Sequence, residues 1–416
     1  MEFIYEEFYS KKESCLVSET EVVKTYEILR DYVAFLNEVS KNTGYEFPES
    51  CINIPFDEKI TSEVVRIKEI LVQKPPKYII DVGIGGSNLG TKAIYDGVFG
   101  YFDILEPKRF PKMIFVDTND AAFLEKLEVF LDKEIKSLDE IVINTVCKSG
   151  ETTETILNTK LLLSLSPKIK ERMVITTNVG SKLWDEAKIQ GISLLSIPEK
   201  VGGRFSVLTA VGLFPILLSG LYIMELVEGS MEITSKCLNG SLLENPAVLS
   251  AIITFLNYKN GKSINDIFIF HPELESLGKW QRQLMAESLG KNGVGITPTV
   301  SIGSTDLHSV EQLYIGGPKD KFTTFVSGNL HNNPSNESSN RVINAIFKGV
   351  KTSYIKNGLP FVEIIFDKPI LHSIGEFFQF KMFEIMYIAK LMNVNAFNQP
   401  NVEAYKAETK KSLSQL

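Results

Sequence analysis

Short apolar runs alternate with helix-forming segments along most of this 416-residue chain, and that alternation restricts the folds it can adopt. In the first half the runs lie at 77–83 (KYIIDVG), 112–118 (KMIFVDT), 141–146 (IVINTV) and 172–178 (RMVITTN), and a helical pattern follows each of them. Each run has the length of a fully buried strand. Strands that alternate with helices indicate crossover connections, and therefore a parallel sheet covered by helices on both faces.

The same alternation returns in the second half. Strand-like runs at 266–272 (DIFIFHP), 321–327 (KFTTFVS) and 361–367 (FVEIIFD) are separated by helical segments, and residues 20–42 carry amphipathic helical spacing. We therefore predict an α/β fold with two parallel sheets. The predicted division is an N-terminal helical segment (1–50), a first α/β domain (51–205), a second α/β domain (206–390) and a C-terminal helical tail (391–416).

The longest apolar stretch, Val207–Leu226, approaches the length of a membrane span. Arg204 and Glu225 flank it closely, however, and Pro215 and Gly220 interrupt it. We interpret the stretch as one buried helix of a large core. The first 14 residues have no basic region followed by an apolar core, so we also expect no signal peptide.

Composition excludes several classes of protein. Apolar residues make up 44% of the chain and charged residues 23%, which is ordinary globular usage. The formal net charge of −7 argues against a nucleic-acid partner, because phosphate backbones require clustered Lys and Arg. The cysteines are widely spaced, so we expect free thiols in a reducing cytoplasm, no disulfide framework and no metal site. They are Cys15, Cys51, Cys147 and Cys237.

A glycine-rich turn, Asp81–Gly90 (DVGIGGSNLG), lies between a predicted strand and a helix. Glycines let the backbone approach a ligand closely, and a helix N-terminus offers unpaired N–H groups to an anion. The turn lacks the spacing of a dinucleotide fingerprint, and the order Thr91-Lys92 differs from a Walker A loop. The alternative interpretation is a tight structural turn.

A second polar turn, Cys147–Thr155 (CKSGETTET), follows the strand at 141–146. Its hydroxyl groups, together with Lys148 and the following helix N-terminus, could hold a phosphate dianion. An N-cap rich in Ser, Thr and Glu is the alternative. Because two strand ends present such residues, we expect a phosphorylated small-molecule site at the carboxyl edge of the first sheet.

Single charged or titratable residues give weaker signals. Arg204 lies among glycines ahead of an apolar segment, so it is either functional or part of a structural ion pair. Glu287 precedes Gly290, a predicted helix C-cap, where the helix dipole disfavours a carboxylate. A solvent-facing Glu explains that position equally well. His308 lies near a predicted helix start, and a structural role is its alternative. Nothing local marks Lys406 as catalytic.

Taken in order, six segments resemble the glucose-6-phosphate isomerase (phosphoglucose isomerase) family. They span roughly residues 80–410 and are GIGGSNLG, CKSGETTET, GGRFS, AESLGK, STDLHS and FNQPNVEAYK. The resemblance implies two sugar-isomerase (SIS) α/β domains with a C-terminal helical tail, usually in a homodimer. It also implies interconversion of D-glucose 6-phosphate and D-fructose 6-phosphate, which requires no metal and no cofactor. From the cysteines and the lack of a signal peptide, we expect a cytoplasmic protein with no membrane partner.

The resemblance assigns roles to particular residues. Glu287 aligns with the base that moves a proton between C1 and C2, and Arg204 with the arginine that stabilises the enediolate. His308 and Lys406 align with residues that open the sugar ring. The implied substrate-binding residues are Gly86, Ser87, Cys147, Lys148, Ser149, Thr152, Gln283 and Gln399.

Three positions depart from the family pattern. Cys147 stands where Ser is usual, Glu151 where Thr is common, and Asn88 in place of a frequent Asp. Glu151 would repel a phosphate if it pointed inward, so we predict that it faces solvent. Two other functions stay open at this point. They are a non-catalytic SIS protein that binds sugar phosphates and an amino-sugar phosphate isomerase.

Overall fold

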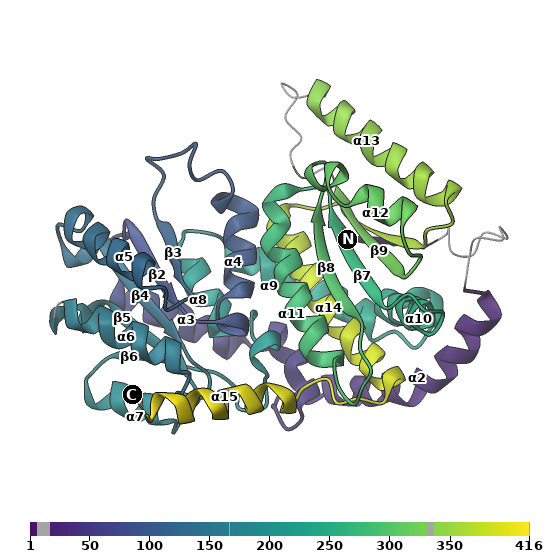
Figure 1. Cartoon of the computed structure of the whole chain (residues 1–416). Coiled ribbons are helices and arrows are strands. Elements are labelled where there is room, and N and C mark those ends of the chain that lie inside the picture. The colour runs from purple at the N-terminus through teal and green to yellow at the C-terminus, as the bar shows by residue number, and fades with distance from the viewer. Residues whose placement is uncertain (6–16, 166, 329, 331–336, 416) are drawn as a thin grey trace.

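The computed structural model of the chain describes residues 1–5, 17–165, 167–328, 330 and 337–415 (Figure 1). Cys15 lies outside this range, whereas Cys51, Cys147 and Cys237 are buried free thiols. Two five-stranded sheets stand side by side, each with its own covering helices, and the predicted α/β class is confirmed. In the described part of the chain, no helix combines the length and apolar character needed to cross a bilayer.

The first sheet is entirely parallel and has the order β3-β2-β4-β5-β6. Four of its strands coincide with the predicted runs. The fifth, β6, was not predicted because its four residues (SLLS) form too short an apolar run. The strands are β2 (Tyr78–Val82), β3 (Lys112–Val116), β4 (Ile141–Val146), β5 (Met173–Thr177) and β6 (Ser193–Ser196).

The second sheet has the order β1-β10-β9-β7-β8 and contains two strands that the sequence analysis missed. One is β8 (Thr297–Ile302), whose threonines and proline leave no continuous apolar run. The N-terminal segment is not wholly helical, because β1 pairs antiparallel with β10. The strands are β1 (Glu2–Ile4), β7 (Ile264–Ile269), β8 (Thr297–Ile302), β9 (Lys321–Gly328) and β10 (Phe361–Phe366).

Helices follow the strands in the expected alternation. Those of the first half are α2 (Glu19–Ser40), α3 (Glu58–Leu71), α4 (Leu89–Tyr95), α5 (Ala121–Glu134), α6 (Thr153–Leu165) and α7 (Lys182–Ile189). Those of the second half are α10 (Pro246–Lys259), α11 (Glu275–Leu289), α12 (Glu311–Gly316), α13 (Glu337–Lys356), α14 (Ile370–Met392) and α15 (Pro400–Leu413).

The apolar stretch expected to form one helix forms two, which corrects that prediction. They are α8 (Ala210–Leu218) and α9 (Ile223–Cys237). The chain turns at Gly220, whose φ of +89° lies in the left-handed region that favours glycine. Both helices are largely buried, so the stretch is apolar because it fills the core.

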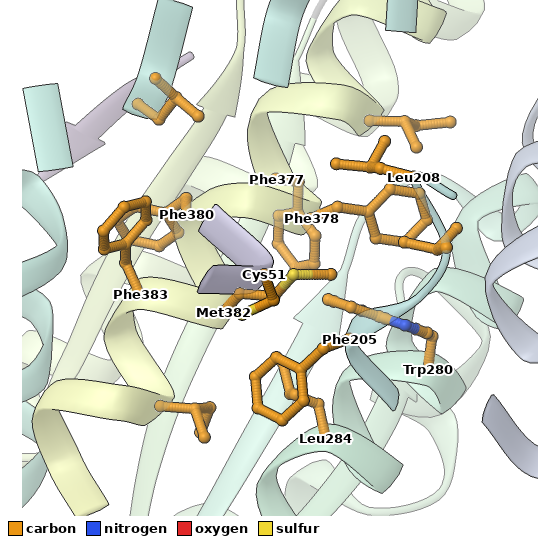
Figure 2. Close-up of a cluster of buried hydrophobic side chains, with 14 of the residues drawn as sticks. Cys51, Phe205, Leu208, Trp280, Leu284, Phe377, Phe378, Phe380, Met382 and Phe383 are labelled. Carbon is orange, nitrogen blue, oxygen red and sulfur yellow. The ribbon is translucent and has the colours of Figure 1, made fainter. Parts of the chain in front are cut away.

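One aromatic core ties the two halves of the molecule together (Figure 2). Phe205 comes from the segment after the first sheet, Trp280 and Leu284 from α11, and Phe377 and Phe378 from α14; all are fully buried. Trp280 and Phe378 meet edge to face with ring centroids 4.5 Å apart. This packing holds Phe205, and therefore its neighbour Arg204, against the helix that carries Glu287.

Candidate active site

Arg204 lies at the centre of a buried polar cluster. It is the middle residue of a 3₁₀ turn (Gly203–Phe205), and only 3% of its surface is exposed. Its guanidinium donates to Ser288 Oγ at 2.8 Å, to Glu287 Oε2 at 3.2 Å and to Gln399 Oε1 at 3.1 Å. It also donates to the backbone oxygens of Ala396 and Asn398. Burial lowers the pKa of Arg204, and the Glu287 carboxylate opposes that shift.

Glu287 lies in the last turn of α11, and Gly290 is its C-cap, as predicted. Both carboxylate oxygens have a partner. Gln283, one turn earlier, donates from Nε2 to Oε1 at 2.8 Å, while Arg204 donates to Oε2. About a quarter of the Glu287 side chain (28%) remains exposed, so a ligand can reach it. The structure therefore brings four predicted residues together: Arg204, Gln283, Glu287 and Gln399.

The glycine-rich turn after β2 packs directly against this cluster. A Cβ on Gly86 would lie 2.4 Å from the carbonyl carbon of Gly203, and one on Gly85 would lie 2.8 Å from Gln283 Nε2. Gly86 is therefore needed for a close approach of two backbones, and Gly85 for the approach of the Gln283 side chain. Asn88 is 1% exposed, and its side-chain amide has no hydrogen-bond partner among the described residues. Ser87 is half-buried beside it.

The second polar turn follows β4 and leads into the N-terminus of α6. Cys147 is buried, Lys148 and Thr152 are half-buried, and Ser149 is exposed. Burial lowers the pKa of Lys148, with Arg204 acting in the same direction and Glu199 against it. The Lys148 ammonium thus lies within the electrostatic reach of Arg204.

Glu151 is exposed to solvent, as predicted. A cleft of about 560 Å³ opens beside this turn at the carboxyl ends of β4, β5 and β6. Its lining includes Ser149, Asn178, Ser181, Ser196 and Glu199.

His308 does not reach Glu287 within one chain, and Lys406 has a different acidic partner. Glu287 lies just before the connection into β8, whereas His308 is exposed in the turn beyond the other end of that strand. Six residues of strand separate those ends by about 20 Å. Lys406 lies on α15 with 41% of its side chain exposed, and its Nζ donates to Glu403 at 3.0 Å.

The sequence analysis missed two members of the cluster, Ser288 and Lys291. Lys291 is only 6% exposed, and its Nζ donates to the backbone oxygens of Ser288 and Asn395. Burial and the nearby Arg204 lower its pKa to about 8, whereas Glu287 acts in the opposite direction. Its position beside a predicted C-cap made it resemble an ordinary helix-terminal lysine, because cations are common there.

One group of metal-ligating side chains occurs in the described residues, away from this cluster. Ligand atoms of Glu232, His372 and Glu376 lie within 4.8 Å of one another. Lys368 Nζ already lies among them, 2.6 Å from Glu232, 3.3 Å from His372 and 3.5 Å from Glu376. Because a lysine supplies the positive charge, we assign no metal there.

Comparison with known proteins gives concordant results. The family model described as phosphoglucose isomerase matches residues 68–308. A glucose-6-phosphate isomerase from Methanocaldococcus jannaschii is 34% identical over 373 residues, which cover 84% of this chain and 90% of that protein. One from Mycoplasmopsis synoviae is 30% identical over 402 residues, covering 91% and 88%. The crystal structure of a glucose-6-phosphate isomerase from Chlamydia trachomatis shares the fold, with a TM-score of 0.81 over 96% of this chain and 86% of that chain, at 19% identity.

Proposed function

We propose that this chain, which belongs to the phosphoglucose isomerase family, interconverts D-glucose 6-phosphate and D-fructose 6-phosphate. The observation that carries the proposal is the contact between a buried arginine and a partly exposed glutamate contributed by separate segments. An aldose–ketose isomerisation needs this pair, because one group must remove a carbon-bound proton while a fixed cation stabilises the resulting negative charge.

Glu287 is the proposed base. It takes the proton from C2 of the open-chain sugar and returns it at C1, which is geometrically simple because the two carbons are adjacent in a cis-enediol. Gln283 and Arg204 hold the two carboxylate oxygens, so the orientation of the base is fixed before the substrate arrives. A well-placed base contributes about 10²–10⁴-fold to the rate.

Arg204 is the proposed stabiliser of the enediolate. Negative charge develops on the O1/O2 side of the sugar as the C2 proton leaves. A guanidinium stays protonated despite burial, and it costs no reorganisation during the reaction because its donors are already directed. Loss of such a contact typically costs about 3–4 kcal/mol.

The phosphate group of the substrate is proposed to bind at the two polar turns. Gly86, Ser87 and the turn Cys147–Thr152 surround the phosphate end, and Lys148 adds a positive charge there. Gln283 and Gln399 contact the sugar. The proton transfer as proposed uses no metal ion and no cofactor.

Ring opening is proposed to require a second copy of the chain. The family resemblance implies His308 and Lys406 for this step. In its own chain, His308 is separated from Glu287 by strand β8, which is about 20 Å long. In a homodimer, His308 of one copy can approach Glu287 of the other. Lys406 is proposed to move toward the substrate from α15, leaving Glu403.

The proposed location is the cytoplasm, in glycolysis or gluconeogenesis. Cys51, Cys147 and Cys237 are buried free thiols, which suits a reducing compartment. No membrane or nucleic-acid partner enters the proposal, in keeping with the net charge of −7.

The decisive experiment is isomerase turnover of the purified chain on fructose 6-phosphate, followed by the formation of glucose 6-phosphate. Glucosamine 6-phosphate and mannose 6-phosphate are assayed in parallel. Faster turnover of the amino sugar would favour an amino-sugar phosphate isomerase. Binding of sugar phosphates with no turnover of any of them would favour a regulatory SIS protein.

A further inference from the structure

Lys291 combines deep burial with an unusual set of partners. It follows the C-cap of α11, and a two-residue turn fixes its backbone, since Lys291 and Val294 exchange backbone hydrogen bonds of 3.0 and 2.9 Å. Asn292 and Gly293 have φ values of 54° and 77°, the conformation that a tight hairpin turn requires. The side chain therefore leaves a rigid base, and its Nζ contacts backbone oxygens.

The segment 395–399 supplies oxygen acceptors for both Lys291 and Arg204. It connects α14 to α15, and its oxygens are directed at two cations. Lys291 donates a hydrogen bond to the backbone oxygen of Asn395. Arg204 donates to the backbone oxygens of Ala396 and Asn398 and to the side-chain oxygen of Gln399. Lys291 also binds the backbone oxygen of Ser288, whose hydroxyl accepts from Arg204. One lysine thus joins the end of α11 to this segment.

We propose that Lys291 is a positioning residue that fixes segment 395–399 against α11, so that Gln399 and Arg204 keep their geometry at Glu287. The proposal rests on the proposed isomerase function. It adds a residue that the family resemblance leaves without a role and that need not touch the substrate.

The energetics favour a function over simple packing. Taking an ammonium out of water is expensive unless it is well paired, and backbone carbonyls compensate less than a carboxylate does. Two charged groups act on Lys291 electrostatically: Arg204 lowers its pKa and Glu287 raises it. A methionine would fill the same space without this penalty. A methionine would, however, lack the donors by which Lys291 joins Ser288 to Asn395.

The test compares Lys291→Met, which removes the donors, with Lys291→Arg, which retains a charged donor. Lys262→Met is the matched control, since Lys262 is 8% exposed and also donates to a backbone oxygen, that of Lys319. We expect Lys291→Met to lower kcat by about 10- to 100-fold with KM changed by less than about threefold, because displaced catalytic groups reduce turnover more than binding. Lys291→Arg should recover most of kcat, and Lys262→Met should leave kcat unchanged.

A second measurement is independent of activity. Amide hydrogen exchange of residues 393–402 should become faster in Lys291→Met and stay unchanged in Lys262→Met. Wild-type kcat in Lys291→Met, or unchanged exchange in that segment, would overturn the positioning role. An inactive wild-type chain would instead contradict the proposed function, and the exchange experiment would still decide whether Lys291 holds the segment.

Discussion

The proposed site has two ends that are held differently: most partners of Arg204 are side-chain atoms, whereas most hydrogen bonds of the turn at residues 147–152 join backbone groups. The Arg204 guanidinium has five oxygen partners, and three of them are side chains. In the turn, Gly150 N donates to Cys147 O at 3.1 Å, and Asn178 N donates to Lys148 O at 3.2 Å. The Thr177 hydroxyl also donates to these two carbonyl oxygens. The positive φ of Gly150, +70°, completes the turn.

This difference follows from the tasks proposed for the two ends. A phosphate carries its charge throughout the reaction, and backbone N–H groups at a helix N-terminus suit a permanent anion. Charge on the sugar carbons develops only during turnover, so directed side-chain groups must be fixed in advance. Changes near Arg204 should therefore lower kcat, and changes near residue 147 should alter KM.

The largest effect is expected for Glu287→Gln. The amide keeps the hydrogen bonds to Gln283 and Arg204 in part but cannot accept a proton from carbon. We expect kcat to fall by about 10²–10⁴-fold with little change in KM. Steady-state kinetics alongside circular dichroism checks this, and near-wild-type kcat in a folded variant would contradict the role of Glu287 as base.

Arg204→Lys should come next. An ammonium keeps the charge but cannot reach all five acceptors, because it has three donors without the planar fork. We expect kcat to fall by about 10²–10³-fold. Lys262→Arg, at a buried lysine that donates to the backbone oxygen of Lys319, is the control for exchanging one cation for the other. Unchanged kinetics in Arg204→Lys would remove its role at the enediolate.

Gly86→Ala tests the contact between the glycine-rich turn and the segment that carries Arg204. The added methyl group would meet the Gly203 backbone at 2.4 Å, and neither backbone can yield cheaply. Overpacking of this kind costs about 1–3 kcal/mol, so we expect a lower urea midpoint and a fall in both kcat and affinity. Gly349→Ala is the control, because a Cβ there meets nothing within 4 Å. Equal stability of both variants would show that the close approach is dispensable.

The pH dependence of stability offers a smaller, signed effect. Folding lowers the pKa of Lys291 to about 8 from its ordinary value, so the unfolded chain binds more protons between about pH 8 and 10.5. Stability contributed by this group therefore rises with pH in that window and is constant below it. Relative to Lys291→Met, the wild type should gain about 1–2 kcal/mol between pH 7.5 and 9.5 in urea unfolding. If the difference in unfolding free energy between wild type and Lys291→Met did not change with pH, the lowered pKa of a buried Lys291 would be contradicted.

Cys147→Ser should produce the smallest change. A hydroxyl donates a stronger hydrogen bond than a thiol, and a neutral hydrogen bond contributes about 0.5–1.5 kcal/mol. We expect KM to fall by no more than about tenfold, with kcat unchanged. A large change in kcat would break the proposed division between the two ends.

The elements predicted well from sequence have strong local patterns. The strands of both sheets with continuous apolar runs were found, and the six-motif resemblance agrees with the family match. Strand β8 was missed because threonines and a proline interrupt its apolar pattern. Val207–Leu226 was assigned to one helix because apolar content does not reveal the break at Gly220.

The site residues divide in the same way. Arg204 and Glu287 could be named from motifs, but their contact joins residues 83 positions apart, and periodicity carries no information on such pairs. Lys291 is the last residue of the AESLGK segment, but its role depends on Asn395, 104 positions away, which no local pattern indicates. The distance between His308 and Glu287 likewise became visible only once β8 was placed between them.

The segment 395–399 also has a consequence for synthesis on the ribosome. Arg204 and Gln399 are 195 positions apart, so the guanidinium emerges long before its last partners. At about 5–20 residues per second, this interval is on the order of 10–40 s. During that time the first sheet can form while the arginine still lacks the oxygens that will enclose it. Translation of residue 399 is therefore the earliest moment at which a newborn chain can acquire the complete cluster.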